Sequence, residues 1–439
     1  MTKPTLVLTP AIAAVSERGG SLDVLVRVQA PEQPAEMASK PTPKRLALVV
    51  DRSGSMSGEP LDEALACVNY IASRMTPADQ ISVVVYDDQV NTLVPLTPVL
   101  SSAEIAAAIA NVRSGGSTAL FDGWERGAQE LEGRTPDTIS RVILLSDGQA
   151  NVGLSNVHEI SHHCTEWLLR GVSTTTVGLG RGFNEDLMMA MSRAGGGQQY
   201  YGQTSADLHD SFDEEFSLLA ALYLRTVGVR LVAAEGVIAQ PLGLVQPGHS
   251  NYYYRLSDLA WGAEVWMGVR LHIKAKPATP VGQTRDLLAV TFQAENLQGR
   301  PIPTQMQMLS LPVVDAAAFA ALASDELVDR RVAELEFAEE SQPLRDLARQ
   351  GRTREVEDLL ARLDARYGRH PWLRDKLARL RRLAREDMEM MGKESHYSAI
   401  KMSARQSNVH EMAYMSDETN TEMPAFLRKK AEEGRGRSK

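Results

Sequence analysis

The chain has few cysteines and no long hydrophobic run. Its 439 residues include two cysteines, Cys67 and Cys164, too few for the disulfide framework of a small secreted domain. A membrane-spanning helix needs a run of about 18 apolar residues, and the sequence contains no such run. The N-terminal residues also lack the basic start and unbroken apolar stretch of a secretory signal. We therefore expect a cytoplasmic protein without a membrane span.

Basic residues are outnumbered by acidic ones. The sequence has 47 Lys and Arg against 56 Asp and Glu, which gives a formal net charge of −9. This balance argues against a surface that coats nucleic acid or an acidic membrane, so we expect no nucleic-acid partner. Hydrophobic residues make up 43% and charged residues 23%, as in ordinary globular proteins. The length is enough for about two to four domains.

Between residues 44 and 222, short apolar strands alternate with amphipathic helices. The expected strands are 46–50, 81–86, 92–99, 142–145 and 173–179. The expected helices are 61–74, 103–112, 119–131, 156–169, 185–193 and 205–222. Wholly apolar strands are typical of a sheet covered on both faces, and the alternation favours parallel pairing through right-handed crossovers. The pattern predicts a doubly wound, Rossmann-like α/β domain over 44–222.

Strand patterns without helices flank this domain. Residues 1–43 contain two strand-like runs and a proline-rich connector, and residues 223–314 contain five more runs. The runs are 5–9, 22–29, 227–232, 252–256, 264–273, 287–293 and 304–311. Seven strands are enough for a β-sandwich, and N-terminal strands outside it would expose unpaired edges. We therefore expect an α/β domain inserted in, or flanked by, a β-sandwich.

The C-terminal part changes character twice. Residues 315–391 carry leucine stripes at helical spacing and predict an α-helical region. From Gly392 the periodicity stops and polar residues with scattered Met predominate, which predicts a disordered tail over 392–439.

Hydroxyl and carboxylate side chains stand where several predicted strands end or helices begin. Asp51, Ser53 and Ser55 alternate directly after an apolar strand, Thr118 comes just before a helix, and Asp147 follows a later strand. Loops at the carboxyl ends of strands are where open α/β sheets bind ligands. Oxygen atoms from three such loops predict a site for a hard cation.

At these residues the chain resembles a von Willebrand factor type A domain of the bacterial intracellular type, over roughly 45–222. The Asp51-x-Ser53-x-Ser55 run, Thr118 and Asp147 match the family's metal-ion-dependent adhesion site, in the family's order. The resemblance implies Mg²⁺ or Mn²⁺ held by Ser53, Ser55 and Thr118, with Asp51 and Asp147 acting directly or through water. Neutral hydroxyl ligands would leave the ion most of its charge, so an open position would attract an Asp or Glu of a partner protein.

The sequence leaves three functions open, and two of them follow from this interpretation. The first is a non-enzymatic interaction protein that binds an acidic residue of a partner through the cation. The second, implied by the resemblance, is a subunit that recruits substrates for an AAA+ ATPase of the MoxR type. The third is a zinc metallopeptidase, suggested by a different motif.

That motif is His158-Glu159-Ile-Ser-His162, which on a helix can place two imidazoles on Zn²⁺ with the Glu as general base. No third ligand follows it at the spacing of known zinc peptidases. The apolar stripe of the same helix contains Ile160 and Cys164, so the histidines fall on the opposite face. We expect a solvated helix face here and no catalytic residue.

The tail carries one further motif, Pro424–Lys430. It resembles the C-terminal peptide of the bacterial tubulin-like division protein, a short segment that docks on several partners. Phe426 and Leu427 could anchor in a groove while the basic residues after them steer the encounter. The motif predicts a tail-binding partner.

Overall fold

The computed structural model describes residues 3–34, 42–99, 101–133, 135, 137–179, 183–202, 205–247, 253–275, 280–403 and 406–408. The chain divides into two compact units. One comprises Pro34–Leu222 with Leu297–Arg300, and the other comprises Met1–Gln33, Tyr223–Asn296 and Pro301–Lys439. Each unit is described by itself.

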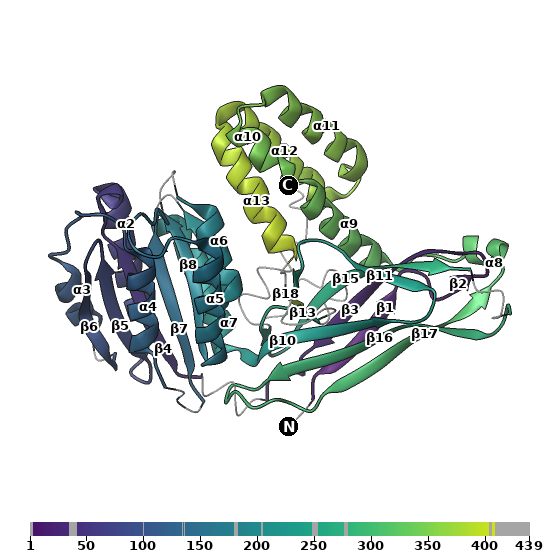
Figure 1. Cartoon of the computed structure of the whole chain (residues 1–439), viewed down its shortest axis with the longest axis horizontal. Coiled ribbons are helices and arrows are strands. Elements are labelled where there is room, and N and C mark those ends of the chain that lie inside the picture. Colours follow the sequence, from purple (N-terminus) through teal and green to yellow (C-terminus); the bar gives the residue numbers. More distant parts are fainter. Residues whose placement is uncertain are drawn as a thin grey trace, which may run out of the picture. The chain divides into compact units, whose positions relative to one another are not determined.

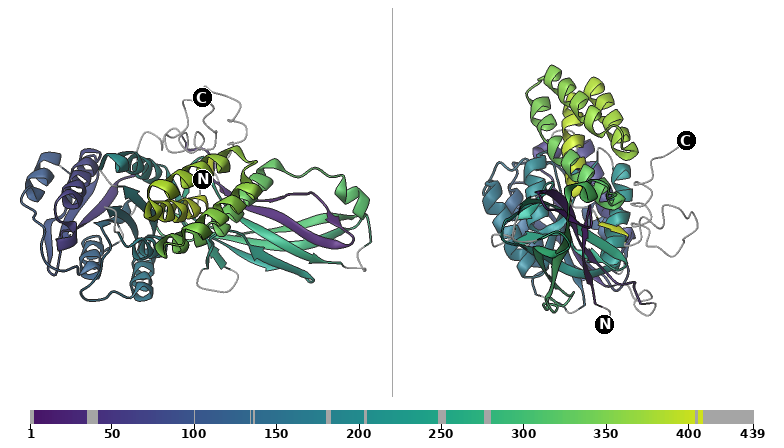
Figure 2. Two further views of the ribbon diagram at one scale, coloured as in Figure 1. Left: turned by 90° about the horizontal axis from the view of Figure 1, so that it is seen from above. Right: turned by 90° about the vertical axis from the view of Figure 1, so that its right-hand side faces the viewer.

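The first unit is built around a six-stranded sheet with helices on both faces (Figures 1 and 2). In spatial order the strands are β6 (Val90–Pro98), β5 (Gln80–Tyr86), β4 (Lys44–Asp51), β7 (Ile139–Ser146), β8 (Val172–Leu179) and β9 (Gly196–Gly202). The helices are η1 (Gly54–Met56), α2 (Glu59–Ser73), α3 (Ser102–Ile109), α4 (Leu120–Glu130), α5 (Val157–Leu169), α6 (Glu185–Ala194) and α7 (Ser205–Ala220). The predicted doubly wound α/β fold is confirmed.

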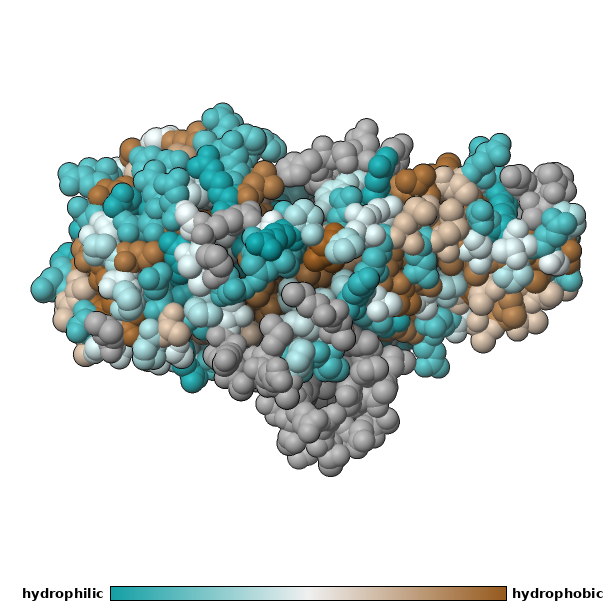
Figure 3. Space-filling model, turned by 90° about the horizontal axis from the view of Figure 1, so that it is seen from below, coloured by the Kyte–Doolittle hydropathy of each residue, from teal (hydrophilic) through white to brown (hydrophobic). Residues whose placement is uncertain are grey.

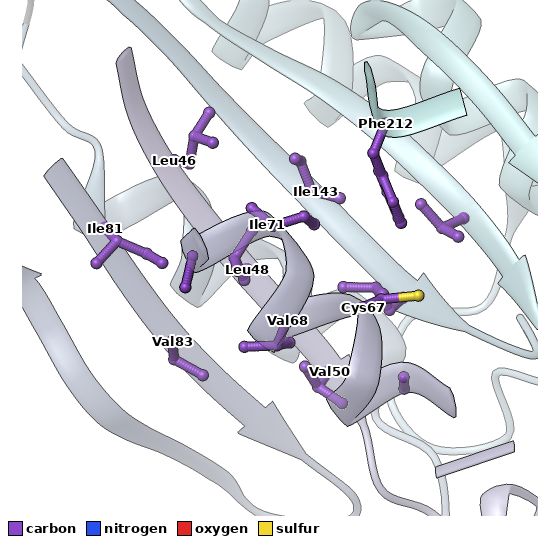
Figure 4. Close-up of a cluster of buried hydrophobic side chains, with 14 of the residues drawn as sticks. Leu46, Leu48, Val50, Cys67, Val68, Ile71, Ile81, Val83, Ile143 and Phe212 are labelled. Atoms are coloured by element: carbon purple, nitrogen blue, oxygen red, sulfur yellow. The ribbon is translucent and has the colours of Figure 1, made fainter. Parts of the chain in front are cut away.

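Alternation along β4 explains the two layers. Leu46, Leu48 and Val50 pack with α2, α3 and α7 on one face of the sheet, as Figure 4 shows for several of these residues. Ala47 and Val49 pack with α4, α5 and α6 on the other face. Because successive side chains of a strand point to opposite faces, an unbroken apolar strand is buried on both sides.

Two strands of this sheet differ from the predicted pattern. β6 runs antiparallel to β5, whereas the strand–helix alternation favoured parallel pairing. Only residues 87–89 separate the two strands, and so short a connection cannot make the crossover that a parallel pair requires. The sequence pattern also missed β9, because glycine-rich segments are poor strand formers. Gly197 is needed there, since a Cβ atom would lie 2.2 Å from the carbonyl oxygen of Thr174.

The second unit contains two sheets and a helical region. One sheet has the order β1 (Thr5–Pro10), β3 (Gly19–Gln29), β15 (Ala263–Lys274), β11 (Val237–Pro241), with β18 (Gln406–Asn408) also paired with β15. The other has the order β12 (Gln246–Pro247), β13 (Tyr253–Arg255), β10 (Leu222–Ala233), β16 (Thr284–Glu295), β17 (Gln305–Val314), β2 (Val15–Ser16), with β14 (Leu259–Ala260) paired with β10. The helices are α8 (Ala316–Ala320), α9 (Glu326–Glu340), α10 (Pro343–Arg349), α11 (Thr353–Tyr367), α12 (Pro371–Glu386) and α13 (Met388–Ser403).

Strands from before and after the α/β unit share one sheet. β3 pairs antiparallel with β15 from Gln29↔Glu264 to Gly19↔Lys274. The N-terminal strands therefore have partners, as the edge argument requires. Packing of the two sheets as a β-sandwich stays a prediction.

The seven-stranded sheet exposes apolar side chains on one face. Val232 on β10 is 49% exposed, and Met306 and Met308 on β17 are 72% and 44% exposed. Figure 3 views the molecule from the side on which β16 and β17 lie and shows hydrophobic residues between hydrophilic ones. This face of the sheet is in contact with solvent in the described part of the chain.

The prediction that disorder begins at Gly392 is wrong. α13 continues to Ser403, and its Met391, Ala399 and Met402 are buried in the core of the helical region. Polar residues such as Ser395, which is 1% exposed, are buried between them. Because these polar residues interrupt the apolar stripe, the periodicity does not reveal the helix.

The motif Pro424–Lys430 lies outside the described residues. Within the described residues, none of the helices combines the length and the apolar character needed to cross a membrane. The cysteines Cys67 and Cys164 are buried and unpaired. Burial, together with the negative charge of Glu63, raises the pKa of the Cys67 thiol to about 12.

A buried ion pair fastens α7 to the sheet. Arg141 on β7 and Glu215 on α7 form a hydrogen-bonded salt bridge, and both side chains are almost wholly inaccessible. Thr175 and Tyr200 donate hydrogen bonds to Glu215, each at 2.8 Å. The hydroxyl of Ser173 accepts from Nε of Arg141 at 2.9 Å. Each charge therefore has partners, which a buried pair requires.

Removing one charge of this pair should destabilise the α/β unit. We expect Glu215→Gln to lower the free energy of unfolding by about 3 kcal/mol or more, because Arg141 would lose the buried carboxylate with which it forms its salt bridge. Asp213→Asn is the matched control on the same helix, since Asp213 is 47% exposed and its solvent-exposed bridge to Arg74 should contribute little to stability. Denaturant titration measures both, and equal losses would contradict the prediction.

Close packing of α4 on the sheet gives a second test. A Cβ atom at Gly127 would lie 2.3 Å from Cγ2 of Val49. Alanine favours a helix over glycine by about 1 kcal/mol, yet we expect Gly127→Ala to destabilise the protein by about 1–3 kcal/mol through overpacking. Gln129→Ala, at an exposed position of the same helix, should have little effect. A rise in melting temperature for Gly127→Ala would refute the overpacking.

Candidate metal centre

The first segment of the site is the loop that follows β4. Asp51 is the last residue of the strand, and its Oδ1 accepts a hydrogen bond from the backbone N–H of Ser53 at 2.9 Å. The hydroxyl oxygens of Ser53 and Ser55 lie 3.2 Å apart. Asp51 and Ser53 are buried, whereas Ser55 is exposed. One hydroxyl of the pair therefore belongs to a buried residue of the unit and the other to a residue at its surface.

The second segment is the glycine-rich loop before α4. Gly116 has φ +72°, and a Cβ atom there would lie 2.2 Å from Oδ1 of Asp88, so the position needs glycine. Its carbonyl accepts a hydrogen bond from the N–H of Gly54 at 3.1 Å, which joins this loop to the first segment. Thr118 is buried, and its N–H donates to Oδ1 of Asn151 at 2.7 Å.

The third segment follows β7, which runs parallel to β4 and directly beside it. Ser146 donates a hydrogen bond to Oδ2 of Asp51 at 2.6 Å and accepts one from the N–H of Gly148 at 2.7 Å. Asp147 is 8% exposed, and its Oδ1 accepts from the N–H of Gln149 at 3.1 Å. The three predicted segments therefore meet at the carboxyl-terminal edge of the sheet.

Negative charge is concentrated at this edge. Burial raises the pKa of Asp51, hydrogen bonds from Ser146 and Ser53 oppose the rise, and the nearby carboxylate of Asp147 adds to it. Burial also raises the pKa of Tyr86 well above its usual value, and its hydroxyl donates to Oδ2 of Asp51 at 3.2 Å. A cation at this edge would therefore be attracted by carboxylates that are partly withdrawn from water.

The available donors decide which cations fit. Among the described residues, no group of three or more His, Cys, Asp and Glu side chains is placed to hold a metal ion. An ion would therefore have to use hydroxyl and water oxygens besides carboxylates. The 3.2 Å between the Ser53 and Ser55 hydroxyls is close to the ~3 Å between adjacent ligands of an octahedral ion with bonds of about 2.1 Å. The residues thus fit a hard cation such as Mg²⁺ or Mn²⁺.

Sequence patterns missed several residues that support the site. Tyr86 ends β5 and Asp87 follows it, so the rule that singled out Asp147, a carboxylate directly after an apolar strand, also applies to Asp87. Asn151 holds the backbone of Thr118 from both sides, because its N–H also donates to the Thr118 carbonyl at 3.1 Å. No local pattern in the sequence marks that contact.

The His158–His162 motif lies on the outer side of α5. His158 and Glu159 are exposed, and the side chain of His162 is 73% exposed and lies 3.6 Å from Glu166. Ile160 and Cys164 are buried on the opposite side of the helix. The predicted solvated face is confirmed, and the geometry gives no support to the peptidase alternative.

Residues 46–214 match the family model of the von Willebrand factor type A domain. The α/β unit is therefore a domain of this type, as the sequence motifs predict.

Two relatives each match about half of the chain. An uncharacterized protein of Synechocystis sp., sll0103, is 27% identical over 214 residues, which are 47% of this chain and 49% of that protein. Inter-alpha-trypsin inhibitor heavy chain H3 of Homo sapiens is 30% identical over 224 residues, which are 48% of this chain and 24% of that protein. The match thus spans about half of the first relative and a quarter of the second.

Solved structures resemble more of the chain. A von Willebrand factor type A protein from Catenulispora acidiphila superposes with a TM-score of 0.66 at 13% identity, covering 91% of this chain and 97% of that one. The ArnB paralog VWA2 from Sulfolobus acidocaldarius gives a TM-score of 0.57 at 16% identity, covering 91% and 98%. At these identities the likeness shows a shared fold.

The hydroxyl of Ser146 provides a test of the site's internal hydrogen bonds. We expect Ser146→Ala to lower the free energy of unfolding by about 1.5–3 kcal/mol, because the lost hydrogen bond is made to a buried carboxylate and the Gly148 N–H also loses its acceptor. Ser82→Ala is the matched control, a buried strand serine that donates to the carbonyl of Val94 and should contribute about 1 kcal/mol. Chemical denaturation in EDTA compares them, and a smaller loss at Ser146 than at Ser82 would refute this role.

Proposed function

We propose that the von Willebrand factor type A domain of this chain binds a protein partner through a divalent cation, Mg²⁺ or Mn²⁺, and an acidic side chain of that partner. Ser53, Ser55 and Thr118 would hold the ion, and Asp51 and Asp147 would contribute directly or through water. When bound, the ion supplies a positive centre with an open position for a carboxylate oxygen.

The observation that carries this proposal is the arrangement of Asp51 behind the two serine hydroxyls. Both of its carboxylate oxygens already accept hydrogen bonds, Oδ1 from the backbone N–H of Ser53 and Oδ2 from the hydroxyl of Ser146. Its charge can therefore stabilise a cation from behind while neutral hydroxyls face it. A cation with neutral ligands keeps more of its charge for an incoming anion than one with carboxylate ligands.

The composition of the site favours binding over catalysis. The candidate centre consists of Asp51, Ser53, Ser55, Thr118 and Asp147 and contains neither histidine nor cysteine. Serine nucleophiles are usually activated by an adjacent general base such as histidine. One relative is named as the heavy chain of an inhibitor, which agrees with a role in binding proteins.

Metal titration tests the proposal. We expect the 439-residue chain to bind Mn²⁺ in calorimetry and Ser53→Ala and Asp147→Ala to bind it about tenfold or more weakly, because each removes an oxygen from the site. Ser102→Ala, an exposed serine at the start of α3, is the matched control and should bind as the unaltered chain does. Equal affinities in all variants would remove the basis for the proposal.

A pull-down from the native host identifies the partner. The chain should retain its partner in Mg²⁺ and release it in EDTA, and Asp147→Ala should fail to capture it in either buffer. Retention of a MoxR-type AAA+ ATPase would favour the recruiting role. A partner that stays bound in EDTA would contradict contact through the ion.

A further inference from the structure

Arg52 lies between Asp51 and Ser53 of the candidate centre, but it is not itself one of the proposed oxygen donors. Its backbone N–H donates to the carbonyl of Tyr86 at 2.8 Å, and its carbonyl accepts from the N–H of Gly115 at 2.9 Å. Its guanidinium reaches Asp87, with Nη2 lying 3.0 Å from Oδ2. The two side chains are 23% and 12% exposed, so the pair is largely screened from solvent. Arg52 therefore contacts both β5 and the glycine-rich loop.

Asp87 in turn contacts the segment that carries Thr118. Its carbonyl accepts a hydrogen bond from the N–H of Ala119, the residue after Thr118, at 2.8 Å. Its Oδ1 accepts from the N–H of Gln89 at 2.8 Å, which fixes the carboxylate in the turn after β5. Gly116 is packed against Asp87 so closely that a Cβ atom would lie 3.1 Å from the Asp87 Cβ. Displacement of Asp87 would therefore move the Thr118 segment.

From these contacts we infer that Arg52 is a positioning residue of the metal centre. Its ion pair with Asp87 fixes the backbone that carries Thr118 relative to the hydroxyls of Ser53 and Ser55. This inference rests on the proposed function of that centre.

Two physical requirements explain why the backbone that carries Thr118 must be held in place. A small hard cation demands bonds of about 2.0–2.1 Å in nearly octahedral directions, so hydroxyls from two different loops must be held within about 0.5 Å. Asp51, Asp87, Asp88 and Asp147 also bring four like charges to one edge of the sheet. The guanidinium of Arg52, with Nη2 3.0 Å from Oδ2 of Asp87, offsets part of that repulsion.

The test compares Arg52→Ala with Arg52→Lys and with Arg74→Ala. Arg74 forms another arginine–aspartate pair in the same unit, with Asp213, away from the three loops of the centre. We expect Arg52→Ala to weaken Mn²⁺ binding about tenfold, Arg52→Lys to recover part of the loss, and Arg74→Ala to leave the affinity unchanged. A purely structural contribution would instead lower the melting temperature in EDTA without changing the Mn²⁺ affinity of the folded protein.

A second readout does not depend on metal. In EDTA, hydrogen exchange at the Ala119 amide should be faster in Arg52→Ala than in the unaltered chain and unchanged in Arg74→Ala. Unchanged exchange together with unchanged Mn²⁺ affinity would overturn the role of Arg52 while leaving the proposed centre intact. If the unaltered chain does not bind Mn²⁺, the proposed function is wrong. Hydrogen exchange at the Ala119 amide would still decide whether Arg52 positions the segment that carries Thr118. If Arg52→Ala does not fold, the same two measurements on Arg52→Lys and Asp87→Asn decide the matter.

Discussion

The buried carboxylate of Asp51 is the constraint on which the candidate centre depends. An ionised side chain loses the solvation of water when it is buried, so it must be surrounded by donors. Here the donors come from three places, the Ser53 N–H on its own loop, the Ser146 hydroxyl on the next strand and the Tyr86 hydroxyl on the strand at the other side. Satisfying one carboxylate therefore draws the carboxyl ends of three neighbouring strands into one hydrogen-bonded cluster.

The order of strands makes this convergence possible. β4 lies between β5 and β7, and the chain passes from one side of β4 to the other between them. At such a switch point, connections leave toward opposite faces of the sheet and open a crevice for a ligand. The strong apolar character of β4 buries it at the centre of the unit, so its last residue is held by neighbours on both sides. The same central strand thus supplies both the core of the fold and the first residue of the centre.

The local sequence pattern predicted those elements whose character is visible in a few consecutive residues. Unbroken apolar runs such as Leu46–Val50 and the alternate placing of Asp51, Ser53 and Ser55 are visible in a few consecutive residues. Elements that depend on partners elsewhere were missed or misjudged. β9 consists of glycine, glutamine and tyrosine residues and is a strand because β8 pairs with it. α13 continues past Gly392 although polar side chains interrupt its apolar stripe, and the buried hydroxyl of Ser395 donates a hydrogen bond to the carbonyl of Ser341.

The amino-acid sequence by itself determined the alternating α/β architecture of residues 44–222 and the oxygen-bearing residues at the ends of its strands. Both follow from hydrophobic periodicity and from side-chain chemistry, which can be read from residues that are neighbours in the sequence. Only the tertiary structure decided the pairing of β9 with β8, the burial of the Arg141–Glu215 pair and the contact of Arg52 with Asp87. Each of these depends on the distance between residues far apart in the chain, and that distance exists only after the strands have paired and the helices have packed.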